Sequence, residues 1–465
     1  MQSEEIGFIE TVITSIRHNY IGYNISIIYY SRYFIVCALY FGYNIVNYIF
    51  SRWGEFMSYI HRAMENTFLR LNKEFPALLL TGPRQVGKTT MLQKLAKDEN
   101  IGREYVTLDD LTERQMAKND PKMFLQIHKP PVFIDEVQYA PELFTYIKIH
   151  VDQNQRAGDF WLTGSQVFKL MEGIQESLAG RVCLLHMAPM SQAEIYGAAT
   201  APFVLDLEQL SKRVKKRTPI DTPALYERIF RGGMPALISG QYSDYRALYS
   251  SYISTYIDRD VKELSGSIDS LKFMDFITSA AALCGQMLNY KTVADAVDID
   301  QITVKKWFGI LERLGIVFYL HPYSNNMLKR MVTKPKLYFY DCGLVAYLTK
   351  WSDGATLMNG AMSGAILENF VVSEIVKSYQ NCGWEAFIYY YRDKDTKEID
   401  ILLEDSGKLY PMEVKKTATP QKQLTRVFSV IDKATLERGA GAVLCTTDRL
   451  SAFDSQNLIV PIWGI

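Results

Sequence analysis

Residues Leu78–Leu95, LLLTGPRQVGKTTMLQKL, join an apolar run to a glycine-rich turn and then to an amphipathic segment. The part from Gly82 to Thr89 fits the pattern G-x-x-x-x-G-K-[ST], which needs a strand before it and a helix after it. The apolar run at Ala77–Thr81 suits a buried parallel strand. The apolar residues after the turn recur at helical spacing. This order directs backbone N–H groups at a phosphate, and we expect a nucleotide-binding loop.

Each residue type in this loop suits a nucleotide phosphate and its metal ion. Gly82 and Gly87 allow a tight turn, Lys88 would contact the β- and γ-phosphates, and Thr89 would coordinate Mg²⁺. The alternative is an ordinary strand, turn and helix. The expected ATP-binding residues are Gly82, Pro83, Arg84, Gln85, Val86, Gly87, Lys88, Thr89 and Thr90.

A second apolar strand ends in two carboxylates. The stretch PPVFIDEVQYAPELF (130–144) carries Asp135 and Glu136 directly after its apolar residues. If this strand ends beside the phosphate loop, Asp135 would hold Mg²⁺, directly or through water, and Glu136 would polarise the attacking water. The alternative is a strand followed by a solvated acidic turn.

A third apolar strand, DFWLTGSQ (159–166), ends in small polar residues. A hydroxyl at such a strand end can sense the γ-phosphate, and Ser165 is the first candidate, with Thr163 next. Arg181, in ESLAGRV, follows a glycine and is a candidate arginine finger or sensor. A surface arginine in a salt bridge is the alternative, and an effect on a neighbouring subunit remains open.

These residues together resemble the P-loop ATPases of the broad AAA-type class. More narrowly, the chain resembles a bacterial and archaeal group that shares GPRQVGKTT, IDEVQ, LTGSQ, SLAGR and, later, RGGMPAL (231–237). The resemblance extends from Met57 nearly to the carboxyl terminus and implies an ATPase core over residues 57–200. Members of the group are usually described as ATPases of uncertain cellular role, so an activity is implied more firmly than a purpose.

Residues 201–265 are predicted to form a linker and a helical lid. The basic run SKRVKKRTPIDTP (211–223) ends in turn-forming residues, which predicts a mobile linker or an exposed loop, with a DNA-contacting patch as the alternative. The following residues have a helical pattern, and the AAA-type resemblance implies a lid over the nucleotide. Arg231 and Arg259 are weak candidates for phosphate sensors.

Residues 266–333 predict a winged helix-turn-helix. A helix, a short helix with a turn, and a longer helix that leads into a strand follow one another in this order. Gln301, Thr303, Lys305 and Lys306 lie near the start of the longer helix, where DNA contacts would occur. Winged helices also bind proteins, so both kinds of partner remain open.

The last segment, residues 334–465, contains a second set of chemically suggestive residues. Residues 385–417 predict three strands, the last two joined by the hairpin turn EDSGK. Asp400 lies in the middle strand, while Glu413 and Lys415 share one face of the third. Glu368 lies on a predicted helix upstream. Asp400 and Glu413 would hold Mg²⁺ with the carbonyl of Val414, and Lys415 would position a water or stabilise phosphate charge.

This second pattern resembles the PD-(D/E)xK nuclease fold, with Glu368, Asp400 and the sequence EVK at 413–415 at the matching positions. The motif is short and tolerant of other contexts. The alternatives are a hairpin with an exposed Glu–Lys pair, and a member of the fold that has lost catalysis.

Residues 1–56 form an apolar amino-terminal extension. The run at 33–50 is uncharged and long enough to span a bilayer, for which about 17–25 residues are needed. Three interpretations remain: a membrane anchor within residues 21–50, a packed or interfacial helix, and translated upstream sequence before a natural start at Met57. The last is favoured slightly, because Ile, Tyr, Asn and Phe are what AU-rich codons encode.

Composition limits the broad class of protein. The chain has 51 basic and 51 acidic residues, which argues against bulk nucleic-acid binding but leaves a local basic face open. The six cysteines are scattered, without a C-x-x-C pair, which argues against a zinc site and favours a reducing cytoplasm.

The sequence therefore predicts α/β main domains: a P-loop core with a helical lid, a winged helix, and a carboxyl-terminal domain like restriction endonucleases. The predicted function is Mg²⁺-dependent ATP hydrolysis coupled to action on double-stranded DNA. The alternative is a nucleotide-gated switch that binds a protein partner, with a catalytically silent carboxyl-terminal domain. Oligomerisation remains open.

Overall fold

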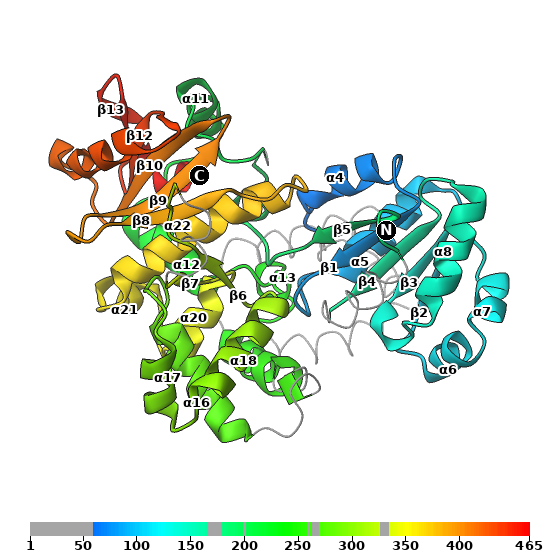
Figure 1. The fold of residues 1–465 in the computed structure, drawn as a ribbon. Coiled ribbons are helices and arrows are strands. Elements are labelled where there is room, and N and C mark those ends of the chain that lie inside the picture. Colours follow the sequence, from blue (N-terminus) through cyan, green and yellow to red (C-terminus); the bar gives the residue numbers. More distant parts are fainter. Residues whose placement is uncertain (1–58, 166–177, 199–200, 258–260, 263–268, 326–333) are drawn as a thin grey trace, which may run out of the picture. The chain divides into compact units, whose positions relative to one another are not determined.

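A parallel sheet forms the first layer of the described structure. The computed structural model describes residues 59–165, 178–198, 201–257, 261–262, 269–325 and 334–465. The strands of this sheet are β1 (Ala77–Thr81), β2 (Glu104–Thr107), β3 (Val132–Asp135), β4 (Phe160–Gly164) and β5 (Val182–His186). They lie in the order β2-β3-β4-β1-β5 (Figure 1). Because all these strands are parallel, the carboxyl ends of β1, β3 and β4 meet at one edge.

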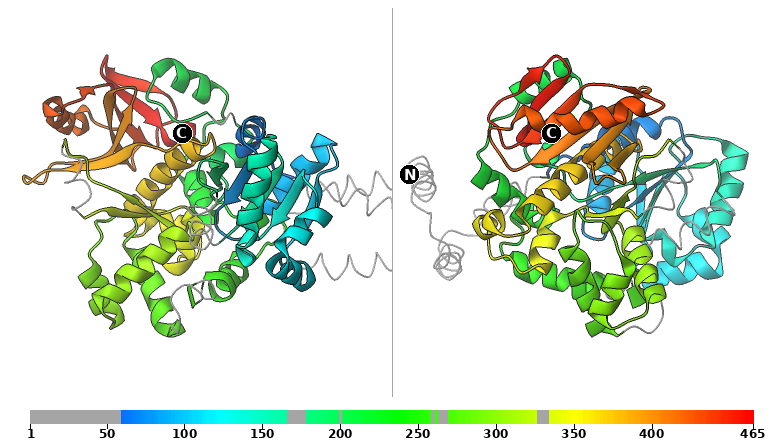
Figure 2. Two further views of the ribbon diagram at one scale, coloured as in Figure 1. Left: turned by 45° about the vertical axis from the view of Figure 1, so that its right-hand side comes forward. Right: turned by 60° about the vertical axis from the view of Figure 1, so that its left-hand side comes forward.

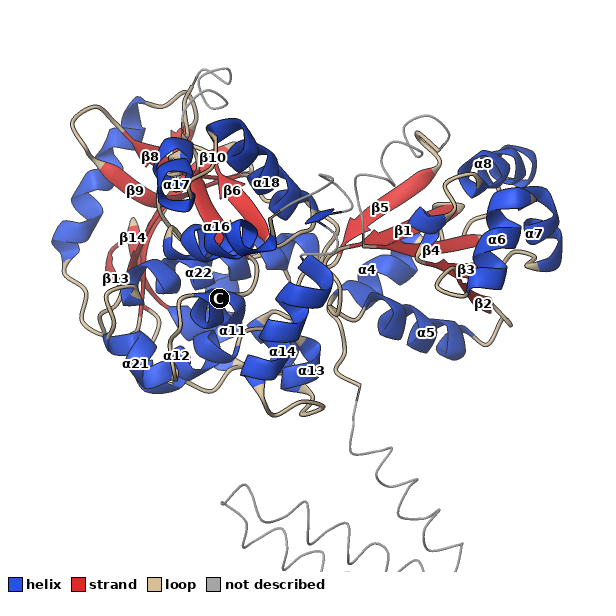
Figure 3. Cartoon of the chain, turned by 90° about the horizontal axis from the view of Figure 1, so that it is seen from below, coloured by secondary structure: helices blue, strands red, loops and turns tan. Residues whose placement is uncertain are grey.

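Helices cover both faces of this sheet, because its central strands are apolar on both sides. The helices are α4 (Met64–Leu71), α5 (Lys88–Glu99), α6 (Leu111–Asn119), α7 (Pro121–Ile127) and α8 (Leu143–Asn154). Leu78 and Trp161 are buried against α4 and α5, whereas Leu79 and Ile134 are buried against α6, α7 and α8. Figure 3 shows α4 and α5 on one side of the strands and α6, α7 and α8 on the other.

Residues 211–215 of the basic run are helical, so the prediction of a mobile linker or exposed loop is wrong there, whereas residues 216–221 lie in no helix or strand. The described helices in this segment are α11 (Leu207–Lys215), α12 (Thr222–Arg231), α13 (Pro235–Ile238), α14 (Tyr245–Ser251) and the π-helical η2 (Tyr252–Ile257). The side chain of Asp206 caps α11, and Leu210 is buried. Arg213 donates to the carbonyl of Pro202 at 2.9 Å, and Arg217 donates to that of Trp463 at 3.0 Å. These two arginines therefore bind backbone.

The expected lid packs mainly with the carboxyl-terminal half of the chain. Helix α12 contacts α20 (Cys342–Leu348), α21 (Gly354–Asn359) and α22 (Ser363–Gln380). Its buried residues belong to the same apolar cluster as the carboxyl-terminal strands. The start of α13 does reach the phosphate loop, because a Cβ added to Gly87 would lie 4.0 Å from Cγ of Pro235. A role of this helical segment as a lid over the nucleotide stays a prediction.

Three helices and a strand pair follow. They are α16 (Ser270–Ala282), α17 (Tyr290–Val297), α18 (Gln301–Arg313) and the antiparallel strands β6 (Val317–Leu320) and β7 (Lys336–Phe339). A bridge between Met287 and Lys336 adds a short extended segment between α16 and α17. The order of helices and strands agrees with the prediction. Residues 326–333, between β6 and β7, lie outside the described residues.

A mixed sheet forms the carboxyl-terminal part. It contains β8 (Ile388–Arg392), β9 (Glu398–Asp405), β10 (Lys408–Lys415), β12 (Gly441–Cys445), β13 (Ser451–Asp454) and β14 (Asn457–Pro461). The predicted hairpin joins β9 and β10 through Ser406 and Gly407, whose φ angles of 49° and 76° suit a two-residue turn. The helical segment η3 (Lys422–Lys433) then leads to β12, which is parallel to β10. Figure 2 shows these orange to red strands beside the yellow α22, which contacts β10.

Residues 1–58 lie outside the described residues, and the three interpretations of the amino-terminal extension lie there with them. Arg259 also lies outside. Among the helices that the structure describes, none combines the length and the apolar composition needed to cross a membrane.

Candidate functional site

The glycine-rich turn joins β1 to α5 as predicted, and two of its glycines are required by its geometry. Gly82 has φ 138°, and a Cβ there would lie 2.1 Å from the carbonyl oxygen of Met187. Gly87 has φ 93° and precedes the first residue of α5. The Lys88 ammonium donates to the carbonyls of Gly82 at 2.8 Å and Pro83 at 2.7 Å. The turn is therefore closed on itself by the lysine that would contact phosphate.

Asp135 lies at the end of β3, next to the start of α5. The hydroxyl of Thr89 donates to Oδ1 of Asp135 at 3.0 Å, and the hydroxyl of Tyr105 donates to Oδ2 at 3.1 Å. Thr163, from β4, donates to the same carboxylate. Burial raises the pKa of Asp135, and the hydrogen bonds from these hydroxyls oppose that rise. A hydroxyl and a carboxylate that converge in this way fit two oxygen ligands of Mg²⁺.

Glu136 follows β3 with a left-handed backbone, φ 56°. Its N–H donates to Oγ1 of Thr163 at 3.2 Å. The amide of Gln138 donates to its carboxylate, and the hydroxyl of Ser165 donates to Oε2 at 3.4 Å. Ser165 therefore lies beside the candidate base, whereas Thr163 is bound to Asp135. The sequence pattern did not predict that Gln138 would contact Glu136 or that Tyr105 would contact Asp135.

The remaining loop residues differ in exposure, and one further residue contacts the loop. Gln85 and Thr90 are exposed, Arg84 is half-buried and Val86 is buried. The guanidinium of Arg62, just before α4, donates to the carbonyl of Val86 at 2.5 Å. Nothing in the glycine-lysine pattern marked Arg62, because it lies before the strand and outside the motif.

Arg181 does not lie at the phosphate site of its own chain. It precedes the amino end of β5, whereas the phosphate loop follows the carboxyl end of the neighbouring parallel strand β1. Its guanidinium pairs with Asp152 on α8, with Nε at 2.5 Å from Oδ1. The prediction that Arg181 acts as a sensor within its own subunit is therefore wrong. Its action as an arginine finger on a neighbouring subunit stays a prediction. Arg231 pairs with Glu227 at 3.1 Å and is exposed.

His186, the last residue of β5, should make the protein sensitive to acid. Its side chain is partly buried, and this burial together with the charge of Lys88 lowers its pKa from 6.5 to about 4. Between these two values the unfolded chain binds a proton that the folded chain excludes, so stability falls as the pH drops through this window. The full contribution is about 3 kcal/mol. We expect the denaturation midpoint of wild type to fall more steeply between pH 6.5 and 4 than that of His186→Gln. Equal pH dependence of the midpoint in the two proteins would contradict a lowered pKa of His186.

The carboxyl-terminal candidates Asp400, Glu413 and Lys415 lie together across β9 and β10. The ammonium of Lys415 is 3.0 Å from Oδ2 of Asp400 and 2.6 Å from Oε2 of Glu413. The N–H of Val414 donates to Oδ2 of Asp400 at 2.9 Å. Burial and the nearby charge of Asp400 raise the pKa of Glu413 to about 8. The other Glu413 oxygen, Oε1, is buried without a hydrogen-bond partner.

Glu368 joins this cluster from α22, and Lys336 from β7 accompanies it. The Lys336 ammonium is 3.0 Å from Oε1 of Glu368 and 2.7 Å from Oε1 of Glu398. The hydroxyl of Tyr338 also donates to Glu368, at 2.6 Å. Burial and the charge of Asp400 raise the pKa of Glu368 to about 7, against the opposing charge of Lys336. The sequence pattern missed Lys336 and Tyr338, which precede the motif.

The two lysines bear on the predicted metal site. In the part of the chain that the structure describes, no group of three or more His, Cys, Asp or Glu side chains is arranged to hold a metal ion. Lys415 instead bridges Asp400 and Glu413, and Lys336 bridges Glu368 and Glu398. A metal ion at this cluster would have to compete with these ammonium groups.

The start of α18 presents most of the residues predicted to contact DNA. Gln301, Lys305 and Lys306 are exposed. Thr303 is used locally, because its N–H and hydroxyl donate to the capping carboxylate of Asp300 at 2.9 Å and 2.6 Å. Thr303 is therefore engaged in capping rather than in a surface contact.

Comparison with protein families finds a match for the region that contains the phosphate loop. Residues 74–196 match a family described as AAA domain. This match spans the phosphate loop, Asp135 and Glu136, and it supports an ATP-binding AAA-type P-loop ATPase domain in this part of the chain. Residues 222–355 and 363–465 match two families, each described as a domain of unknown function (DUF8612 and DUF4143).

Relatives extend beyond the AAA domain. An uncharacterized protein of Mycobacterium tuberculosis is 27% identical over 359 residues, which cover 77% of this chain and 74% of that protein. An uncharacterized protein of Methanocaldococcus jannaschii is 23% identical over 330 residues, which cover 64% of this chain and 67% of that protein.

Two solved structures resemble parts of the chain. The Walker-type ATPase paby2304 of Pyrococcus abyssi has a TM-score of 0.37 and 13% identity, and the similarity covers 61% of this chain and 94% of that chain. The RuvB Holliday junction branch migration motor of Thermotoga maritima has a TM-score of 0.29 and 16% identity, with 56% and 89% covered. At these TM-scores neither likeness carries a conclusion about this chain.

Proposed function

We propose that this protein is a Mg²⁺-dependent ATPase that couples ATP hydrolysis to action on DNA. The observation that carries the ATPase part is the convergence of Lys88, Thr89, Asp135 and Glu136 at one edge of the first sheet. These residues come from α5 and from the end of β3, and the contact between Thr89 and Asp135 joins the two.

The loop residues bind and orient the nucleotide. Lys88 exchanges its two carbonyl partners for the β- and γ-phosphate oxygens, and the N–H groups at the start of α5 donate to phosphate. Thr89 and Asp135 are the residues that would hold Mg²⁺, which neutralises developing charge on the phosphates when it is bound. Tyr105 and Thr163 keep the Asp135 carboxylate in place.

The hydrolytic step depends on Glu136 and its neighbours. Glu136 accepts a proton from the attacking water or polarises it, which a positioned carboxylate does efficiently. Gln138 and Ser165 donate to this carboxylate and fix its orientation. Ser165, whose hydroxyl donates to Glu136, is also the proposed sensor of the γ-phosphate.

The DNA part of the proposal is supported by α16, α17, α18 and the strand pair that follows. Their order resembles a winged helix-turn-helix, in which the last helix enters the major groove. Lys305 and Lys306 are exposed near the start of α18, where they would contact phosphates. The rival function is a nucleotide-gated switch in which the same surface binds a protein.

Phosphate release with and without double-stranded DNA separates these functions. We expect the wild type to hydrolyse ATP in Mg²⁺, DNA to stimulate turnover several-fold, and rising salt to remove this stimulation, because phosphate contacts release counterions. Lys88→Ala serves as the inactive control. Equal turnover by wild type and Lys88→Ala would reject the ATPase, and turnover that is indifferent to DNA would favour the protein-binding switch.

A second candidate function, DNA cleavage, is favoured by the carboxyl-terminal cluster. The succession of α22, β8, β9, β10, η3 and β12, with β10 and β12 parallel, resembles the PD-(D/E)xK fold. The buried, unpartnered Oε1 of Glu413 fits a cation ligand. Mg²⁺ held by Asp400 and Glu413 would supply Lewis-acid chemistry to a phosphodiester. Lys415 would then stabilise the charge on phosphate.

Cleavage by this cluster predicts a defined loss. Asp400→Ala should abolish Mg²⁺-dependent cutting of plasmid DNA, because it removes the carboxylate that contacts both Lys415 and the N–H of Val414. Asp405→Ala, on the same strand but at the hairpin turn, is the matched control and should cut like wild type. Gel analysis of the products measures the result. If Asp400→Ala still cut DNA, the cleavage activity would belong to another site. If wild type did not cut DNA, a catalytically silent carboxyl-terminal domain would be favoured.

A further inference from the structure

The segment from Met187 to Glu194 runs between the phosphate loop and α22. At its start, the Met187 carbonyl leaves no room for a side chain at Gly82, where a Cβ would lie 2.1 Å away. The N–H of Met187 donates to the carbonyl of Thr81 at 2.8 Å. This segment is therefore in direct backbone contact with the residues on which the phosphate loop begins.

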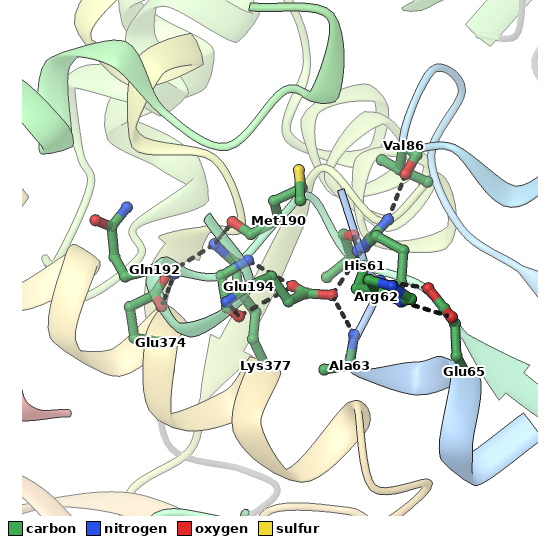
Figure 4. Close-up of polar contacts among 12 residues, drawn as sticks. His61, Arg62, Ala63, Glu65, Val86, Met190, Gln192, Glu194, Glu374 and Lys377 are labelled. Carbon is green, nitrogen blue, oxygen red and sulfur yellow. Dashed lines mark hydrogen bonds and ion pairs between the residues drawn. The ribbon is translucent and has the colours of Figure 1, made fainter. Parts of the chain in front are cut away.

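A buried ion pair holds the segment to the loop at Glu194. Arg62 and Glu194 have side chains 4% and 1% exposed, and Nε lies 2.8 Å from Oε1. The same guanidinium donates to the carbonyls of Val86 at 2.5 Å and Ala188 at 2.8 Å. Glu194 Oε2 in turn accepts from the N–H of Ser191 at 2.7 Å. One arginine thus ties the phosphate loop to both halves of the segment (Figure 4).

A second buried ion pair holds the segment to α22. Glu374 and Lys377 are each 5% exposed and lie 3.0 Å apart. Oε2 of Glu374 accepts from the N–H of Gln192 at 2.7 Å. The ammonium of Lys377 donates to the carbonyl of Met190 at 3.4 Å. Figure 4 shows Arg62 on one side of Glu194 and Glu374 on the other.

We propose that Arg62 and Glu374 are positioning residues for ATP: Arg62 holds the carbonyl of Val86, and Glu374 of α22 holds the segment that carries the partner of Arg62. This inference rests on the proposed ATPase function and adds a role for a helix outside the AAA domain. Neither residue contacts the nucleotide.

The physical reason is that every link is buried and charge-assisted. Hydrogen bonds to ionised groups are shorter and stronger than neutral ones, and they are strengthened where water is excluded. The N–H groups around Val86 and Gly87 can bind phosphate only if the loop keeps its shape, and the guanidinium is the described side-chain donor to the Val86 carbonyl. A loop that loses this contact must be reordered when ATP binds, which weakens affinity.

The consequence for kinetics is specific. A positioning defect in the loop weakens binding of the ground state and the transition state alike, so KM rises while kcat changes little. A general loss of stability would lower the denaturation midpoint without this pattern. The two readouts therefore separate positioning from a merely structural role.

The test uses the full chain and measures KM and kcat for ATP, the Kd of a fluorescent ATP analogue and the denaturation midpoint. Arg62→Lys keeps the charge but cannot reach all three partners, and it should raise KM and Kd about tenfold with kcat within about threefold. The double variant Glu374→Gln, Lys377→Met removes the second ion pair and leaves neither of its two members as a lone buried charge. It should raise KM by a smaller factor.

Arg103→Lys is the matched control. Arg103 is also buried, pairs with Glu99 at 3.1 Å and donates to the carbonyl of Gly158 at 2.8 Å, but it lies beyond the far end of α5. It should lower the denaturation midpoint and leave KM unchanged. The inference would be overturned if Arg62→Lys kept the KM of wild type. It would also be overturned if KM rose in all three variants in proportion to their loss of stability. Wild type that fails to bind the analogue would instead reject the ATPase itself.

Discussion

Replacing Glu136 by glutamine should lower the rate of ATP turnover about 10²- to 10⁴-fold, the usual contribution of a general base. The glutamine side chain has the same size and can keep contacts with Gln138 and Ser165, but it cannot accept a proton from water. The Kd for ATP should stay close to that of wild type, because Glu136 does not belong to the phosphate loop. Phosphate release under saturating ATP and titration with a fluorescent analogue measure the two quantities.

Lys88→Ala provides the contrast for this experiment. It removes the ammonium that closes the loop on the carbonyls of Gly82 and Pro83, so both binding and turnover should be lost. Full turnover in Glu136→Gln would move the role of base to another residue. Loss of binding in that variant would instead indicate that Glu136 is needed to shape the site.

Replacing Asp341 by alanine should destabilise the protein by about 3 to 5 kcal/mol, because buried donors are left without an acceptor. The carboxylate accepts from the hydroxyl of Tyr249 at 2.9 Å and from the N–H groups of Gly343 at 2.9 Å and Gly233 at 3.2 Å. It also caps α20. The denaturant concentration at the midpoint of unfolding measures the loss.

Two milder variants calibrate this expectation. Tyr249→Phe removes one of the three donors, and Asp341→Asn keeps an acceptor oxygen for the two glycine N–H groups. Each should cost about 1 to 2 kcal/mol. If Asp341→Ala were no worse than Tyr249→Phe, the two backbone N–H groups would have found other partners, and Asp341 would not hold the turn at Gly232 and Gly233 against α20.

Helix α22 contributes to both candidate sites. Glu368 lies in the carboxylate cluster, and Glu374, six positions later, holds the segment behind the phosphate loop. If a ligand at one of these sites changed the affinity of the other site for its ligand, the second ligand would change the affinity for the first by the same factor, because coupling between binding sites is reciprocal. The carboxylate cluster and the segment behind the phosphate loop therefore share one helix.

Local patterns predicted the parts of the structure whose chemistry depends on neighbouring residues. The loop from Gly82 to Thr89 needs positive φ at its glycines and a helix start directly after them, and both requirements are written in consecutive positions. The hairpin at Ser406 and Gly407 is of the same kind. The alternation of Glu413, Val414 and Lys415 likewise placed Glu413 and Lys415 on one side of a strand, because side chains alternate in direction.

Which strand ends meet, and which distant charges pair, was decided by the tertiary structure. Arg181 follows a glycine and was a candidate arginine finger, but the parallel pairing of β5 with β1 puts it at the other edge of the sheet. Arg62 and Glu194 are 132 positions apart, and Lys336 and Glu368 are 32 apart, so no local pattern joined them. The sequence by itself determined the phosphate loop with the strand and helix that flank it, and the hairpin at Ser406 and Gly407, because propensity and periodicity act over a few residues. The buried ion pairs around them depend on packing, since a charge finds its partner only after apolar faces have brought distant segments together.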